Sequence, residues 1–222
     1  MNGKSSVTES NMANFLAVDT SGNHLAVVAV KNGIEYATYI ENCAMKHAVS
    51  IMPAVDETLK KAEMQLSECD FFGAVVGAGS FTGIRIGIAT AKGFAAAFSK
   101  PTLPITSFDV AAYNGIDTQG KILCLIDALH DCYYACGYEQ GKVCFAPAYL
   151  TEEEVLALAK DGYALLGGDN LPIAQKAQVQ IIDPVKGLLA AAKALSEEKR
   201  FGDLAALYVR KSSAEINAEG KK

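Results

Sequence analysis

The stretch best suited to chemistry is a glycine-rich loop that follows a short apolar run and opens a long helical pattern. It reads G-A-G-S-F-T-G-I-R-I-G, from Gly77 to Gly87. Glycine permits positive φ and close backbone approach, and the free N–H groups at a helix start favour an anion or a polar group of a partner. The loop is not a P-loop, because the ending G-K-[ST] is missing. It is not a dinucleotide fingerprint either, because Thr82 stands where the third glycine is required.

More polar residues follow the first strand that the pattern predicts, Asn14–Asp19. The carboxyl ends of strands in one open sheet gather at the same edge, so we expect this turn to lie beside the glycine loop. The candidate contacts for a phosphate-type ligand or for an interface of a complex are Asp19, Thr20, Ser21, Gly79, Ser80, Thr82 and Arg85. Two plainer interpretations stay open. The aspartate could bond its own backbone in a polar turn, and the arginine could be a solvated helix charge.

Residue types that would support catalysis do not occur at the required spacing. The histidines at positions 24, 47 and 130 are never three or four residues apart, so a helical metal pair cannot form from them. They fall on separate predicted elements, and no Ser-His-Asp arrangement can be assembled. The six cysteines lack a C-x-x-C knuckle and are interpreted as reduced apolar side chains. The sequence therefore predicts neither a catalytic residue nor a metal site.

The composition limits the classes of protein to which the chain can belong. The chain has 222 residues, 50% of them hydrophobic, which suits one domain or two small lobes. The net charge of −5 and the lack of a basic stripe argue against binding of RNA by the chain alone. No uncharged apolar run reaches the length needed to span a bilayer, and the polar stretch Met1–Ala13 has no signal-peptide core. We therefore expect a cytoplasmic protein whose residues 1–13 form a flexible extension.

Hydrophobic periodicity predicts the elements that position the loop. In the first half they are strands Asn14–Asp19, His24–Lys31 and Ile34–Ile40, helix Ala48–Leu66, strand Phe71–Val76, helix Gly83–Ser99 and strand Leu103–Ser107. In the second half they are strands Lys121–Asp127, Cys132–Glu139 and Lys142–Phe145, helix Thr151–Asp161, strands Tyr163–Leu166 and Val179–Ile182, and helix Pro184–Lys199. The order β-β-β-α-β-α-β of residues 14–115 returns in shortened form in residues 116–222. The sequence thus predicts an α/β, actin/Hsp70/sugar-kinase-like (ASKHA) two-lobe fold with a second lobe too small to clamp a nucleotide.

The helix after the glycine loop has two apolar faces on a wheel of about 100° per residue. The face that should pack on the sheet contains Ile84, Ile88, Ala91, Ala95 and Phe98. The second face, which we call the partner face, contains Ile86, Thr90, Gly93 and Ala97. A helix that covers a sheet needs one apolar face only, so the partner face predicts a protein interface. Burial against the preceding helix of the same chain is an equal alternative.

Read as a whole, the string G-x-G-S-F-T-G-x-R-x-G resembles the signature of the TsaB (YeaZ) family. Three further blocks agree with it: F-L-A-V-D-T-S at Phe15–Ser21, D-A-L-H-D-C-Y-Y-A-C-G-Y at Asp127–Tyr138, and L-Y-V-R-K at Leu207–Lys211. Together they span most of the chain from Asn14 onward. Two residues depart from the family pattern. Ala78 stands where proline is usual and Leu129 where arginine is usual, which puts in doubt any role assigned to that arginine.

The resemblance implies a non-catalytic subunit of the complex that makes threonylcarbamoyladenosine beside the tRNA anticodon. Its partners would be the transferase TsaD, the small ATPase TsaE, a second copy of the chain when alone, and tRNA only through the complex. It implies no cofactor in isolation, with ATP or ADP at an interface of the assembled complex. Two alternatives stay open: an ATP-dependent phosphotransferase of the same superfold, and a metallopeptidase, after the family label "glycoprotease". The H-x-x-x-H metal pair of TsaD-like enzymes has no counterpart at Pro104–Val110.

Overall fold

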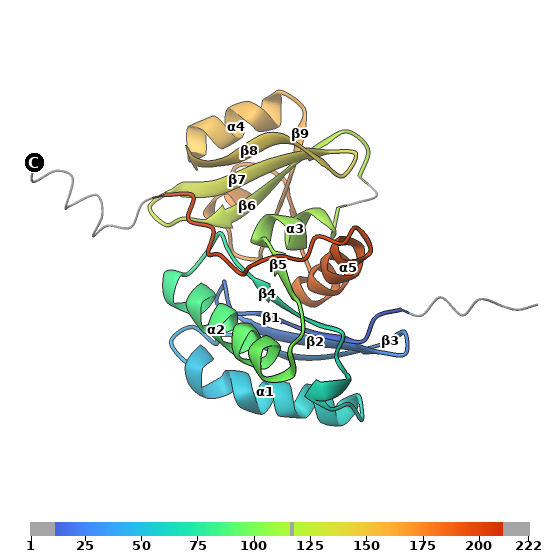
Figure 1. Ribbon diagram of the computed structural model, residues 1–222. Coiled ribbons are helices and arrows are strands. Elements are labelled where there is room, and N and C mark those ends of the chain that lie inside the picture. The colour runs from blue at the N-terminus through green and yellow to red at the C-terminus, as the bar shows by residue number, and fades with distance from the viewer. Residues whose placement is uncertain (1–11, 116–117, 211–222) are drawn as a thin grey trace, which may run out of the picture.

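The computed structural model describes residues 12–115 and 118–210, which form two five-stranded mixed sheets (Figure 1). The first sheet has the order β3-β2-β1-β4-β5, and the second has the equivalent order β8-β7-β6-β9-β10. The strands of the first sheet are β1 (Phe15–Asp19), β2 (Leu25–Lys31), β3 (Ile34–Ile40), β4 (Phe71–Val75) and β5 (Thr102–Ile105). Those of the second are β6 (Lys121–Asp127), β7 (Cys132–Glu139), β8 (Lys142–Thr151), β9 (Tyr163–Gly167) and β10 (Val179–Ile181). The repeated topology confirms the predicted two-lobe fold.

Helices cover both faces of the first sheet. Helices α1 (His47–Lys61) and α2 (Phe81–Phe98) lie on one face, where they close an apolar core around Leu16, Val27 and Phe72. Helix α5 (Pro184–Glu197) closes the other face through its own leucines and alanines. Because both faces are covered, the central strands β1 and β4 are buried along their whole length, which is typical of parallel pairs.

The two halves of the chain exchange helices at the junction of the lobes. Helix α3 (Ser107–Ala112) follows the first sheet in sequence but packs on the second through Phe108 and Ala111. Helix α5 follows the second sheet but packs on the first. The two helices also pack on each other between the sheets (Figure 1). Helix α4 (Glu152–Lys160) covers the far side of the second sheet. The expected division near residue 115 therefore separates the sheets, but not the helices that cover them.

Some element boundaries differ from the sequence prediction. Helix α3 was not predicted; it begins with a capping box in which Thr106 and Asp109 bond each other's backbone N–H groups. Helix α1 ends at Lys61, and a separate 3₁₀ turn occupies Leu66–Glu68. Strand β8 runs on to Thr151, well beyond the predicted end at Phe145. Its late residues pair with the start of β7, which the sequence pattern alone did not show.

The last described segment, residues 201–210, runs back across both lobes. The Gly202 N–H donates to Thr102 O of β5 at 3.0 Å, and the Thr102 hydroxyl donates to Gly202 O. The Leu207 N–H donates to Val76 O at 2.7 Å. The side chain of Leu204 is 1% exposed within the core of the first lobe. Residues 1–11 and 211–222 lie outside the described residues, so most of the expected extension 1–13 is not tested. Met12 and Ala13 do pack against the core, contrary to that expectation.

In the part of the chain that the structure describes, no helix combines the length and the apolar character needed to cross a membrane.

The burial of Leu204 predicts that residues 201–210 are a structural part of the first lobe. Leu204→Ala should lower the free energy of unfolding by about 2–5 kcal/mol, because it leaves a cavity in a closed core. The neighbouring exposed pair Lys92–Asp203 provides the control, and Asp203→Asn should leave the free energy of unfolding almost unchanged. Urea denaturation measures both. Equal stability of Leu204→Ala and wild type would show that the segment is not integral to the core.

Candidate functional site

The turn after β1 and the loop before α2 meet at the carboxyl edge of the first sheet. The Ser80 N–H donates to Ser21 O at 2.7 Å, and the Thr20 hydroxyl donates to Gly83 O at 2.7 Å. Ser107, at the start of α3, joins them, because its hydroxyl lies 2.6 Å from Ala78 O and 3.2 Å from the Ser21 hydroxyl. The predicted proximity of these two segments is confirmed. Whether they bind a phosphate or a partner stays a prediction.

Three glycines let α2 approach the β1 turn closely. An added Cβ at Gly79 would collide with Ser21 O, and one at Gly83 would collide with Thr20 O. At Gly87 it would lie 2.6 Å from the Thr20 hydroxyl oxygen. The three glycines are four residues apart, so they lie on the same side of the segment that enters α2, and this side faces the β1 turn. The glycines thus serve backbone packing, which accounts for them without a ligand.

Several polar groups of the loop are already satisfied within the chain. The Ser80 side chain caps α2 by accepting from the Gly83 N–H at 3.3 Å, and the Ile84 N–H donates to Ser80 O. The Ser21 N–H donates to Asp19 Oδ1 at 2.8 Å, as the polar-turn interpretation expected. A phosphate cradle requires free N–H groups that converge on one point. These three N–H groups are engaged elsewhere, so they are not available to such a cradle.

Asp19 forms a buried ion pair with His24, which the sequence analysis did not single out. His24 Nε2 lies 3.2 Å from Asp19 Oδ2, and Asp19 is 2% exposed. Burial alone would raise the pKa of Asp19, but the charge of His24 and hydrogen bonds from His24 and Ser21 together lower that pKa below its usual value. Burial acts to lower the pKa of His24, but the Asp19 carboxylate, with a smaller contribution from Asp169, raises it. Each member of the pair thus favours the charged form of the other.

Neighbouring side chains hold His24 in place. The His24 ring lies 5.7 Å from the Tyr39 ring, and His47 Nε2 lies 2.9 Å from His24 O. His47 is buried and begins α1, one residue before the predicted start at Ala48. Asp169, whose charge acts on His24, belongs to the turn after β9 in the second lobe. No regular spacing indicates this pair, because Asp19 and His24 are five residues apart across a turn.

Arg85 and Thr82 both lie on the exposed start of α2. The Arg85 guanidinium lies 3.7 Å from the Phe81 ring centre, and its Nε donates to the Tyr208 hydroxyl at 3.1 Å. Tyr208 also stacks on Phe81. The arginine is therefore organised by an aromatic pair rather than freely solvated, and its remaining N–H groups can still reach a partner's anion.

The partner face of α2 is open in its second half. Gly93 and Ala97 are exposed, while Ile86 and Thr90 are half-buried beside the core shared with α1. Helix α1 adds exposed apolar side chains, with Val49 74% and Met52 45% exposed. Burial against the preceding helix therefore accounts for only part of the partner face. Its role in an interface stays a prediction.

Leu129, the departure from arginine, lies exposed in the turn between β6 and β7.

Metal ligands are dispersed in the described residues, among which no group of three or more His, Cys, Asp and Glu side chains is placed to hold an ion. Burial raises the pKa of the Cys69 thiol to about 12 and that of the Cys136 thiol to about 11, so these thiols remain protonated.

The chain is similar to several known proteins. The family model TsaD, described as tRNA N6-adenosine threonylcarbamoyltransferase, matches residues 20–216. The tRNA threonylcarbamoyladenosine biosynthesis protein TsaB of Bacillus subtilis is 27% identical over 91% of this chain and 90% of its own. TsaB of Escherichia coli is 30% identical over 58% of this chain and 56% of its own. A solved structure from Pseudomonas aeruginosa, described as similar to the peptidase YeaZ, has a TM-score of 0.77 at 25% identity, covering 90% of this chain and 100% of that one.

The close approach at Gly83 predicts opposite effects for two glycine-to-alanine substitutions in α2. Gly83→Ala should destabilise the protein by about 2 kcal/mol or more, because the added Cβ meets backbone. Gly93→Ala should stabilise it by about 0.5–1 kcal/mol, because its Cβ meets nothing within 4 Å and alanine favours helix. Thermal unfolding of both variants measures the contrast. Equal effects would contradict the packing role of Gly83.

The Asp19–His24 pair predicts a pH-dependent contribution to stability. The folded-state pKa of His24 is raised, so its contribution is complete below about pH 6.5 and is lost as the pH rises through the folded pKa. His24→Gln should therefore cost about 2 kcal/mol near pH 5.5 and much less near pH 9. Urea denaturation at several pH values tests this, with the exposed His130→Gln as control. A loss independent of pH would refute the charged pair.

Proposed function

We propose that this chain is a non-catalytic subunit of the complex that makes threonylcarbamoyladenosine in tRNA. The premise is that the chain belongs to the TsaD family, described as tRNA N6-adenosine threonylcarbamoyltransferase. Such a subunit would bind and activate the transferase TsaD, which modifies the adenosine next to the anticodon in the cytoplasm. The end-to-end match with TsaB of Bacillus subtilis supports this role. The structural observation that supports this role most directly is that polar residues of the candidate site bond to one another within the chain.

The engagement of these groups disfavours the two alternative functions. A phosphotransferase of this superfold would need the β1 turn and the glycine loop to receive phosphates and a metal-bound water. Here Asp19 is paired with His24, and the Ser21 and Ser80 N–H groups are used within the chain. A metallopeptidase would need converging ligands. His24 is held by Asp19, the His47 ring contacts the backbone of His24, and His130 is exposed in the second lobe.

The partner face of α2, together with the exposed apolar side chains of α1, is the surface we assign to TsaD. In the absence of TsaD, the same surface would pair two copies of this chain. Interfaces of this kind are apolar at their centre, and small residues allow two backbones to approach closely. TsaE would join the assembled complex, tRNA would bind only through it, and ATP or ADP would bind at an interface of the assembly rather than to this chain alone.

A charged substitution on the partner face should abolish the complex without unfolding the chain. Thr90→Arg places a charge in the contact, which is costly if it is buried and unpaired. Gel filtration of an equimolar mixture with TsaD should show a complex for wild type and separate proteins for the variant. The variant should also fail to stimulate the transfer of threonylcarbamoyl groups to tRNA by TsaD.

Ala157→Arg, on the exposed side of α4 in the second lobe, is the matched control. It should bind and stimulate as wild type does, and circular dichroism should show that both variants are folded. If folded Thr90→Arg still binds TsaD, the surface is wrongly assigned. If wild type neither binds nor stimulates TsaD, the proposed function itself is wrong.

A further inference from the structure

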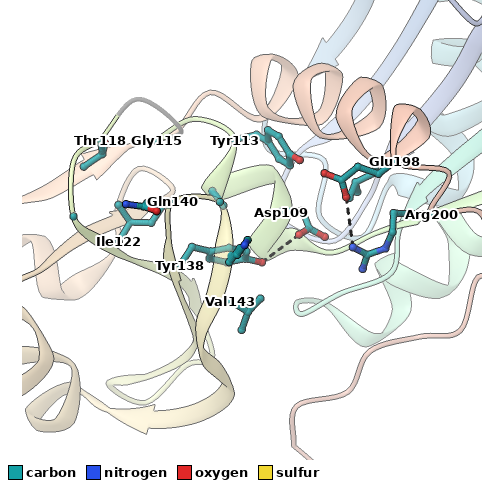
Figure 2. A pocket seen from close by; sticks show the side chains of 15 residues that line it. Asp109, Tyr113, Gly115, Thr118, Ile122, Tyr138, Gln140, Val143, Glu198 and Arg200 are labelled. Atoms are coloured by element: carbon teal, nitrogen blue, oxygen red, sulfur yellow. Dashed lines mark hydrogen bonds and ion pairs between the residues drawn. The ribbon is translucent and has the colours of Figure 1, made fainter.

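A cavity of about 390 Å³ lies at the junction of the two lobes and contains none of the candidate site residues (Figure 2). Its walls come from α3, from the start of β6, from the turn between β7 and β8, and from the end of α5. The elements therefore come from both halves of the chain. Neither the sequence resemblance nor the glycine loop accounts for this cavity.

The inner wall presents a fixed carboxylate. Asp109 Oδ2 accepts hydrogen bonds from the Thr106 N–H at 2.9 Å and the Thr106 hydroxyl at 2.6 Å, and Asp109 Oδ1 lies 3.2 Å from the Tyr138 hydroxyl. Tyr138 is 6% exposed. Burial raises the pKa of Tyr138, and the Asp109 charge raises it further, so the phenol keeps its proton and donates to the carboxylate. Asp109 thus has a defined position on this wall (Figure 2).

Two carboxylates and one cation act on the neighbouring wall of the cavity. Tyr113 lines it and is half-buried. Burial raises the pKa of Tyr113, and the charges of Glu198 and Asp109 raise it further, while Arg200 acts in the opposite direction. A cationic group is therefore favoured next to these carboxylates.

The exposed rim carries two cations. Lys142 follows the β7–β8 turn, and Arg200 follows α5; both are exposed, and Arg200 Nη1 lies 3.6 Å from Glu198 Oε2. With Asp109 and Glu198 they make a lining of zero net formal charge. A phosphate would face two carboxylates, and a simple cation would face two cations. A ligand that carries both charges a few atoms apart matches this lining.

The remaining lining has a polar part, which includes Thr118 and Gln140, and an apolar part. Ala112, Ile122 and Leu195 are buried at 5–6% exposure and line the cavity together with the exposed Val143. We propose that this cavity binds a free α-amino acid with an aliphatic side chain. The ammonium group contacts Asp109, the carboxylate contacts Arg200 and Lys142, and the side chain packs on Leu195 and Ile122. The lining thus has a counterpart for each of the three parts of the ligand.

Calorimetric titration of the wild-type chain with L-leucine and L-valine tests the proposal. We expect saturable binding of at least one of them with a Kd below about 10 mM. N-acetyl-L-leucine lacks the ammonium group and L-leucinamide lacks the carboxylate, so each should bind about tenfold more weakly than L-leucine. Absence of binding by both amino acids, or equal binding of N-acetyl-L-leucine and L-leucine, would overturn the proposal.

Substitutions locate the site. Asp109→Asn preserves the shape and an acceptor for Thr106 but removes the charge, and should weaken binding about tenfold. Asp56→Asn, on the exposed side of α1, is the matched control and should bind as wild type does. Arg200→Gln, at an exposed position, should also weaken binding and serves if Asp109→Asn does not fold. Wild-type affinity in folded Asp109→Asn or Arg200→Gln would refute the assignment. The cavity shares no residue with the partner face, so this result is independent of complex formation.

Discussion

The close backbone contact between Thr20 and Gly83 is the constraint on which the rest of the candidate site depends. The Thr20 carbonyl lies where a side chain at position 83 would be, and the Thr20 hydroxyl donates to Gly83 O. This contact fixes the direction in which α2 leaves the sheet, and with it the location of Arg85 and of the partner face. Glycine at 79 and 87 extends the same approach by one turn in each direction. The glycines of this loop thus allow α2 to pack closely on the β1 turn.

The buried charge at Asp19 follows from the same packing. A carboxylate that is 2% exposed must be paired or neutralised, and a metal ion or a cationic side chain can serve. In this chain the cation is His24, and the Ser21 N–H and hydroxyl complete the hydrogen bonding of Asp19. The Asp19 carboxylate therefore has its cationic partner and its hydrogen-bond donors within the chain.

The sequence predicted what periodicity and turn chemistry determine locally. Both sheets, the proximity of Asp19 to the glycine loop and the start of α1 to within one residue follow from hydrophobic periodicity and strand order. The missed features depend on tertiary contacts. Helix α3 has only six residues, which is too short for a periodic hydrophobic signal. The His24–Asp19 pair depends on the shape of the turn between the two residues. The exchange of α3 and α5 between the sheets has no local signature, because both helices simply look apolar on one side.

That exchange has a mechanical consequence for the two lobes. A clamp that closes over a nucleotide needs lobes that can turn about a hinge with little packing between them. Here α5 packs on the first sheet and α3 packs on the second, and the two helices also pack on each other. The segment 201–210 adds a second connection, from Leu204 in the first core to Arg210, which lies over the Tyr149 ring of β8. Opening the lobes would separate apolar surface at the first connection and break the aromatic contact at the second. The two lobes are therefore joined by packing at two separate places, through α3 and α5 and through residues 201–210.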